Sequence, residues 1–284
     1  MKKVIKKNIK YQTLNCKGKL IDLSKPKIMG ILNISSDSFY DGGKYNSIKK
    51  ALNQTEKMLK EGAFFVDLGA ASSKPGSELI KSEIEKNKIL PVLEILINHF
   101  PEVHFSIDTY NHEVAKASIE LGASMINDIS GGLFDNKMHE TVAKYAVPYV
   151  MMHMKGTPKI MQVKPHYKNI VVEVLSFFSR QTKIAYANGI NDILVDPGFG
   201  FGKNIEHNYN LLKCLSQFKT LECPILIGVS RKSMIYKLLN TTSEEALNGT
   251  SVLNSLALDR GAQILRVHDV KEAKECVDLW LALQ

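Results

Sequence analysis

Residues 104–129, HFSIDTYNHEVAKASIELGASMINDI, contain one complete unit of the pattern that decides the fold. An apolar run, His104–Thr109, is followed by a helical stretch, His112–Leu121, which ends at Gly122, and then by a second apolar run, Met125–Ile129. A glycine directly after a helix is a common C-terminal signal, because glycine adopts positive φ at little cost. Continuous apolar runs are typical of parallel strands that are covered on both faces. The stretch therefore predicts a strand, a helix and a second strand parallel to the first.

The same unit recurs along the chain, where eight apolar runs are each followed by a polar loop. They are Lys27–Asn33, Phe64–Gly69, His104–Thr109, Met125–Ile129, Pro148–Met154, Asp192–Pro197, Pro224–Ser230 and Ile264–His268. Helices are also predicted over Asn46–Glu61, before Gly62, over Ser82–Phe100, with a kink at Pro91, and over Tyr167–Asn188, before Gly189. Eight strands alternating with helices over about 250 residues favour an α/β fold of the (β/α)8 TIM barrel type. A doubly wound open sheet is the alternative.

The segment before the first run has a different pattern. Tyr11–Cys16 and Leu20–Leu23 flank Lys17-Gly18-Lys19, which predicts a hairpin that closes the bottom of the barrel. No linker, low-complexity tract or charge block divides the chain. We therefore expect a single domain over residues 1–284, with residues 1–25 as a hairpin extension.

Composition excludes several classes of protein. The 284 residues are 44% hydrophobic and 23% charged, as in ordinary soluble proteins, and no apolar stretch approaches the roughly 20 residues of a membrane span. The basic start, Met1–Lys7, is not followed by the apolar stretch of a signal peptide, so we expect a cytoplasmic protein without membrane contact. The four cysteines show no CxxC spacing and are expected to be buried thiols. They are Cys16, Cys214, Cys223 and Cys276.

The net charge of +8 raises the question of a nucleic-acid partner. Only four of the 37 basic residues are arginines, and the lysines are spread along the chain. Phosphate-reading surfaces tend to use arginine with interleaved aromatic residues. We therefore expect a solvated lysine-rich surface and no nucleic-acid partner.

The barrel prediction directs attention to the strand ends, because barrel active sites lie at the C-terminal face. Polar residues occupy these positions in all eight runs. They are Asn33, Asp67, Asp108, Asn127, Met152-His153, Asp196, Ser230-Arg231-Lys232 and Arg266-Val267-His268. A capping role could explain any single Asp or Asn, but eight polar strand ends on one rim favour a binding site.

The chemistry of these residues divides into two groups. One group offers acceptors and one amide donor: Asp108, Asn127 and Asp196. Such a set suits a heterocycle with adjacent N–H groups. The other group offers donors and positive charge for phosphate oxygens: Lys232, Arg266 and His268. A phosphorylated heterocycle fits both, and the absence of a Ser–His–Asp or Cys–His pattern favours stabilisation of developing charge over nucleophilic catalysis.

Three loops carry further signals. The glycine-rich stretch Asp196–Lys203 lacks Walker and GxGxxG spacing, so a tight turn with an aromatic wall is expected. No histidine or cysteine spacing indicates zinc, but Asn33 could provide an oxygen ligand to a hard cation held mainly by substrate phosphates. The loops Ile34–Tyr45 and Ala71–Lys81 are long and rich in Gly, Ser and Asp, and we expect them to close over substrate as lids.

Several ordered motifs give the chain, from about Pro26 to its end, a resemblance to the dihydropteroate synthase family of the folate pathway. They are Met29–Ile34, Asp37-Ser38-Phe39, Asp41-Gly42-Gly43, Phe105–Tyr110, Ile126–Gly132, Met152–Pro158, Asp196–Lys203, Gly228–Ile235 and Leu265–Val270. The resemblance implies a barrel enzyme, typically a homodimer, that transfers a pterinylmethyl group. Its substrates would be 6-hydroxymethyl-7,8-dihydropterin diphosphate and p-aminobenzoate, its products 7,8-dihydropteroate and pyrophosphate, and its cofactor Mg²⁺.

The resemblance also implies roles for individual residues. The pterin ring would be held by Asp108, Asn127, Asp196 and Lys232, with Arg266 over its face. The pyrophosphate would be held by Arg266, His268 and, through Mg²⁺, Asn33. The p-aminobenzoate pocket would use Ser73, Pro75, Phe201, Lys232 and Ser233, joined by Phe39 and Lys74 when the loops close. The residues closest to the chemistry would be Asp108, Lys232, Arg266 and His268.

The chain departs from the family in its two long loops. Ser35-Ser36 replaces a usual Thr-Pro, and Ala70-Ala71-Ser72-Ser73-Lys74-Pro75-Gly76 replaces a usual Gly-Glu-Ser-Thr-Arg-Pro-Gly. Lysine in place of arginine keeps the charge but loses the planar fork, so handling of p-aminobenzoate could change. Two alternatives stay open: a pterin-binding methyl-transfer domain, and a non-catalytic paralogue that binds pterin.

Overall fold

Eight parallel strands form the centre of the computed structural model, which describes residues 13–34, 44–70 and 76–284. They are β3 (Lys27–Asn33), β4 (Phe65–Gly69), β5 (His104–Asp108), β6 (Met125–Asp128), β7 (Tyr149–Met152), β8 (Ile193–Asp196), β9 (Leu226–Ile227) and β10 (Ile264–Val267). Their order in the sheet is β8-β7-β6-β5-β4-β3-β10-β9. The edge strands β8 and β9 meet through one parallel bridge, Val195 to Ile225, so the sheet closes. The predicted barrel is confirmed, and the open sheet is wrong.

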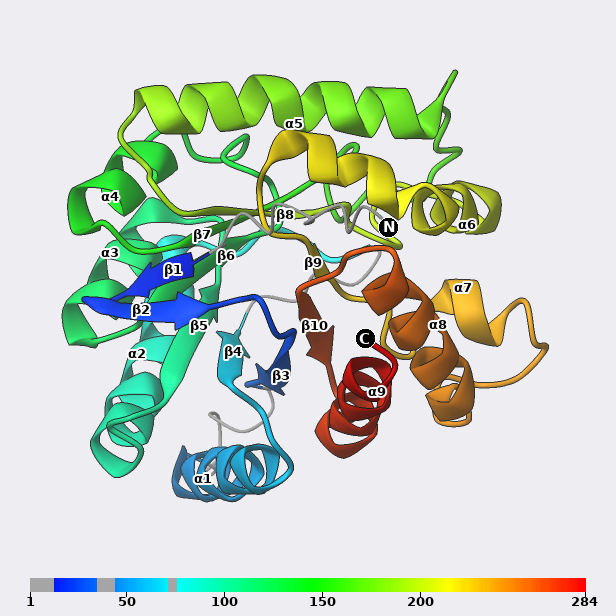
Figure 1. Cartoon of the computed structure of the whole chain (residues 1–284). Helices are drawn as coiled ribbons and strands as arrows, with labels where there is room; N and C mark the ends of the chain where they lie inside the picture. The colour runs from blue at the N-terminus through cyan, green and yellow to red at the C-terminus, as the bar shows by residue number, and fades with distance from the viewer. Residues whose placement is uncertain (1–12, 35–43, 71–75) are drawn as a thin grey trace, which may run out of the picture.

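Helices surround the strands (Figure 1). They are α1 (Lys44–Lys60), α2 (Ser82–His99), α3 (His112–Leu121), α4 (Met138–Tyr145), α5 (Ile170–Ala187), α6 (Ile205–Lys213), α7 (Ser233–Tyr236), α8 (Leu247–Asp259) and α9 (Val270–Ala282), with a 3₁₀ helix at Leu215–Leu221. Within the described ranges, none of these helices is both long and apolar enough to cross a membrane.

Two elements differ from their predicted bounds by more than two residues at one end, for identifiable reasons. Strand β9 is much shorter than the predicted Pro224–Ser230, because it pairs with β10 at only two positions and the chain turns at Val229, whose carbonyl accepts from Lys232 N at 3.1 Å. Helix α5 begins later than predicted because Asn169 caps it, accepting from Val171 N at 3.1 Å.

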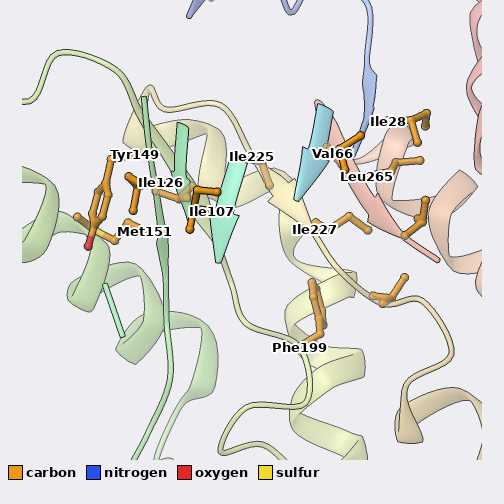
Figure 2. Packing of buried hydrophobic residues seen from close by; sticks show 14 of the residues in the cluster. Ile28, Val66, Ile107, Ile126, Tyr149, Met151, Phe199, Ile225, Ile227 and Leu265 are labelled. Atoms are coloured by element: carbon orange, nitrogen blue, oxygen red, sulfur yellow. The ribbon is translucent and has the colours of Figure 1, made fainter. Parts of the chain in front are cut away.

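Both faces of the barrel sheet are buried, which explains the continuous apolar runs. The outward side chains of the strands pack against the helices in one large cluster (Figure 2). Labelled members of this layer include Ile28, Val66, Ile107, Ile126, Tyr149, Met151, Ile225, Ile227 and Leu265.

The inward side chains near the N-terminal ends of the strands form a second, largely apolar layer. It consists of Met29, Phe65, Met125, Val150, Leu194, Leu226 and Ile264. Strands β1 (Thr13–Cys16) and β2 (Lys19–Asp22) form an antiparallel hairpin whose Leu14 and Ile21 pack against this layer. The predicted hairpin and its place at the bottom of the barrel are confirmed (Figure 1).

The next inward layer, here called the polar layer, includes the polar side chains of Asp67, Asn127, Asp196 and Arg266. Side chains alternate along a strand, so two residues beyond the apolar layer the chain again faces the barrel interior. These positions are Ile31, Asp67, Asn127, Met152, Asp196, Gly228 and Arg266. An apolar floor beneath a polar layer locates the candidate site at the C-terminal half of the barrel.

Candidate active site

Asp67 is the centre of the polar layer. Its side chain is fully buried, and its Oδ1 accepts a hydrogen bond from Ser106 Oγ at 2.6 Å. Its Oδ2 accepts from Asn127 Nδ2 at 2.9 Å and from Arg266 Nε at 2.6 Å. Residues from β4, β5, β6 and β10 are thus joined by one carboxylate, which fixes the orientations of the Asn127 amide and the Arg266 guanidinium.

Arg266 also reaches Asp108 at the end of β5, with 2.8 Å between Nη2 and Oδ2. Burial alone would lower the pKa of Arg266, but Asp67 and Asp108 outweigh it and raise that pKa. Burial raises the pKa of Asp108 well above its ordinary value, and Asp67 adds to this effect while Arg266 opposes it. The predicted acceptor Asp108 and the predicted anion-binding Arg266 are therefore direct partners.

Asp196 and Lys232 flank the loop that follows β8. Asp196 Oδ1 accepts from Gly198 N at 2.8 Å, and burial raises the pKa of this aspartate. Lys232 Nζ donates to the Phe199 carbonyl at 2.6 Å and lies 4.7 Å from the ring centroid of Phe201. Burial lowers the pKa of Lys232 to about 8, although Asp196 opposes that change.

His268 lies beside Ser230 at the ends of β10 and β9. Its Nδ1 is 3.1 Å from Ser230 Oγ, and its backbone N–H donates to the same oxygen at 3.2 Å. Burial lowers the pKa of His268, and the neighbouring Arg266 lowers it further. Without an anion present His268 is therefore mainly neutral at pH 7, a hydrogen-bonding group where the sequence analysis expected positive charge.

The next residues along the same two strand ends are joined by an ion pair. Arg231 donates from Nε and Nη2 to the two oxygens of Asp269, both at 2.8 Å. Arg231 Nη1 also donates to the carbonyls of Ser243 and Glu244. The residue has positive φ, 54°, and its backbone N–H donates to Thr250 Oγ1 at 3.0 Å. Arg231 thus connects the segment that carries Lys232 to the segment that carries His268.

The remaining predicted residues are less well connected. Ser233 begins α7 directly after Lys232, and Asn33 is an exposed residue at the end of β3. Phe39, Ser73, Lys74 and Pro75 lie outside the described residues, as does most of the two loops that we predicted to be lids. Among the residues that the structure describes, no group of three or more His, Cys, Asp or Glu side chains could hold a metal ion.

The sequence analysis missed two residues of this region. It named Asp67 as a strand end but assigned it no role, although an aspartate pointing into a barrel needs a partner and the partners were the other strand ends. It gave no role to Lys203, which is buried beside His153. The proximity of Lys203 to His153 depends on the packing of two loops, and no spacing in the sequence indicates it.

Comparison with known proteins identifies the family that this chain resembles. Residues 29–268 match the family described as "Pterin binding enzyme". Curated relatives include the dihydropteroate synthases of Haemophilus influenzae, 40% identical over 95% of this chain and 98% of theirs, and of Escherichia coli, 42% identical over 93% and 94%.

Solved structures agree as well. Yersinia pestis dihydropteroate synthase in complex with a sulfonamide drug superposes with a TM-score of 0.89 at 41% identity, covering 96% of this chain and 99% of its own. The Xanthomonas albilineans enzyme in complex with 7,8-dihydropteroate has a TM-score of 0.84 at 33% identity, covering 96% and 98%.

The barrel and its polar layer, together with these matches, define a pterin-binding enzyme. More narrowly, the chain belongs to the dihydropteroate synthase family, whose reaction transfers a pterinylmethyl group.

Proposed function

We propose that the polar layer and the strand ends around it are the active site in which this chain condenses 6-hydroxymethyl-7,8-dihydropterin diphosphate with p-aminobenzoate. The observation that carries the proposal is the buried network of Asp67, Asp108, Asn127 and Arg266, which combines acceptors for a ring edge with a guanidinium. The network lies where the barrel fold places its active sites.

The pterin would bind by its hydrogen-bonding edge. Asp108, Asn127 and Asp196 supply acceptors for ring N–H and amino groups, and burial strengthens each such bond. Because Asn127 donates one of its two amide N–H groups to Asp67, its carbonyl oxygen and its second N–H would be left for the pterin. Arg266 would cover the ring face, and Lys232 would donate to a ring acceptor.

The leaving pyrophosphate would be neutralised by Arg266 and His268. Both lie at the end of β10, and an approaching anion would raise the pKa of His268 and so favour its charged form. As the bond to pyrophosphate breaks, negative charge grows on its bridging oxygen, and a fixed cation stabilises that charge without reorganising. The electron-rich dihydropterin would carry the positive character left on the CH₂ group.

Magnesium fits this arrangement with Asn33 as its protein ligand. Mg²⁺ prefers oxygen donors and commonly takes one or two ligands from the protein and the rest from phosphates and water. Asn33 offers an exposed amide oxygen on β3, the neighbour of the strand that carries Arg266 and His268. When bound, Mg²⁺ would add positive charge at the leaving group.

The arylamine of p-aminobenzoate would then attack the CH₂ carbon. It is neutral at pH 7, so a strong general base is dispensable, and we assign Lys232 to positioning. Phe201 and Ser233 would line its pocket beside Lys232, since Lys232 Nζ already lies over the Phe201 ring. Phe39, Ser73, Lys74 and Pro75 would complete the pocket, as the family resemblance implies.

We also propose that the chain acts as a single-domain, cytoplasmic homodimer. The four cysteines are free thiols, which suits a reducing compartment. Exposed apolar side chains four residues apart, Val252 and Leu256 on α8 and Leu279 and Leu283 near the end of α9, give two adjacent helices an apolar surface that a second copy could cover.

The direct test is to measure pyrophosphate release from dihydropterin diphosphate with and without p-aminobenzoate and Mg²⁺, with the product identified by mass spectrometry. We expect dihydropteroate only when all components are present. Asp196→Asn should fold but lose pterin binding, because it would replace a carboxylate that accepts from ring N–H groups. Tight pterin binding without condensation would indicate the non-catalytic paralogue, and unchanged pterin affinity in Asp196→Asn would refute the ring-edge assignment.

A further inference from the structure

The amine of Lys203 is buried among carbonyl oxygens rather than carboxylates. The residue is 2% exposed, and its Nζ lies 2.9 Å from the carbonyl oxygens of both Gly198 and Phe201 and 3.1 Å from that of His153. It also lies 2.9 Å from His153 Nδ1. Burial lowers the pKa of Lys203 well below its ordinary value, and the three carbonyls together with His153 Nδ1 give the buried amine a partner for each of its polar groups.

These carbonyls belong to two loops at the C-terminal end of the barrel. His153 follows β7, and the other two residues belong to residues 197–202, here called the glycine loop. The two loops touch backbone to backbone: a Cβ atom on Gly198 would lie 2.0 Å from the His153 carbonyl oxygen, and one on Gly202 would lie 2.5 Å from that of Lys155. Both glycines have positive φ, 68° and 64°, so the loop path depends on glycine and on the amine that holds it.

A different carbonyl of the glycine loop accepts a hydrogen bond from Lys232. Between the two carbonyls that bind Lys203 lies Phe199, whose own carbonyl accepts from Lys232 Nζ at 2.6 Å. The Phe201 ring lies 4.7 Å from the same Nζ, and the Lys232 side chain passes within 3.5 Å of the position of a Cβ on Gly200. Two lysines therefore bind one short loop through different carbonyls.

We propose that Lys203 is a positioning residue for the reaction, because its amine fixes the glycine loop and thereby places Lys232 and Phe201 at the p-aminobenzoate pocket. The proposal rests on the roles proposed above for Lys232 and Phe201. Lys203 itself is sealed from substrate by the loop, so it acts through its partners. Displacement of a binding group by about 1 Å can cost on the order of 100-fold in rate, so loss of this contact should be measurable.

The test compares Lys203→Met with a matched control, Tyr167→Phe. Tyr167 OH donates to the Gly202 carbonyl at 2.9 Å, so the control removes a buried hydrogen bond from the same loop at a carbonyl that contacts neither lysine. In Lys203→Met we expect the KM for p-aminobenzoate to rise roughly 10-fold or more, with a smaller change in the KM for dihydropterin diphosphate. In Tyr167→Phe the ratio of the two KM values should stay near that of the wild type.

A folded Lys203→Met with the same KM ratio as Tyr167→Phe would overturn the proposal. If Lys203→Met does not fold, Lys203→Arg replaces it, since the planar guanidinium cannot converge on three carbonyls. A raised ratio of the KM for p-aminobenzoate to the KM for dihydropterin diphosphate would then support the proposal, and an unchanged ratio would overturn it. Lys232→Met, measured in parallel, tests the role of Lys232 separately from the role of Lys203. If it leaves both KM values unchanged, the assumed role of Lys232 fails, whatever Lys203 does.

Discussion

Asp67 binds the guanidinium of Arg266 through Nε at 2.6 Å, with no exposed surface of its own. The arginine therefore approaches its substrate with one edge already fixed, and its position is set by β4 as much as by its own strand. A buried charge pair of this kind is weak grounds for stability, because desolvation offsets its attraction, but it defines geometry closely.

Asp67→Asn should weaken pterin binding. The substitution removes the charge that holds Arg266 and changes the group to which Asn127 donates. Hydrogen bonds to charged groups contribute about 1.5–3 kcal/mol, so we expect roughly 10- to 100-fold weaker affinity for the pterin. Titration calorimetry with a pterin ligand measures this. Ser106→Ala is the control, because it removes one hydrogen bond from an uncharged donor to the other oxygen of Asp67, keeps the carboxylate that holds Arg266, and should have the smaller effect. Equal affinities in Asp67→Asn and wild type would show that Asp67 does not position Arg266.

The pH dependence of catalysis should report the deprotonation of Lys232. Burial lowers its pKa from 10.5 to about 8, so the side chain is protonated below that pH and loses its charge as the pH rises through it. We therefore expect kcat/KM to fall above about pH 8, whereas in Lys232→Arg the fall should move to higher pH because a guanidinium stays protonated. Steady-state rates between pH 6 and 10 would check this at saturating Mg²⁺. The same descending limb in both proteins would assign it to another group.

Arg231→Lys should lower stability. Arginine makes two parallel hydrogen bonds to Asp269 and reaches two further carbonyls, a geometry that a single ammonium cannot reproduce. We expect the free energy of unfolding in urea to fall by about 1–3 kcal/mol. Lys271→Ala is the control, since its pair with Glu275 is exposed and 4.0 Å long and should contribute nothing measurable. Equal losses in the two variants would mean that the bidentate pair contributes no more to the free energy of unfolding than an exposed ion pair does.

Removal of magnesium should act on the leaving group. With EDTA present we expect little dihydropteroate, and Asn33→Ala should require a higher Mg²⁺ concentration for half-maximal rate while retaining pterin affinity. Rates across a Mg²⁺ titration test both points. An unchanged Mg²⁺ requirement in Asn33→Ala would exclude Asn33 as a ligand, and full activity in EDTA would exclude the metal from the reaction.

Much of the fold was predictable because burial on both faces leaves a direct trace in sequence. Strand β3 and helix α3 have the predicted bounds, and Gly122 ends α3 as expected. Strand β9 was overestimated because an apolar run shows that a segment is buried but not how many of its residues pair with neighbouring strands. That number depends on barrel closure, here a single bridge between Val195 and Ile225.

The site was predictable to the extent that strand ends meet on one rim. Asn127 and Arg266 are joined through Asp67, and Asp108 is joined directly to Arg266, as expected of strand ends that meet on one rim. The lowered pKa of His268 was not predictable, since it depends on burial and on the closeness of Arg266. Nor was the contact of Lys203 with three carbonyls, because it arises where the loops after β7 and β8 pack together.

The apolar floor beneath the polar layer has a consequence for how such an enzyme can change over evolutionary time. Phe65 and Asp67 are two residues apart on β4, yet Phe65 packs with the apolar floor and the hairpin, whereas Asp67 binds Arg266 in the candidate site. Substitutions that alter recognition of a substrate or an inhibitor can accumulate at the rim while the hydrophobic foundation stays intact. New specificities, including tolerance of an antibacterial compound, can therefore arise in this scaffold without a prior gain in stability.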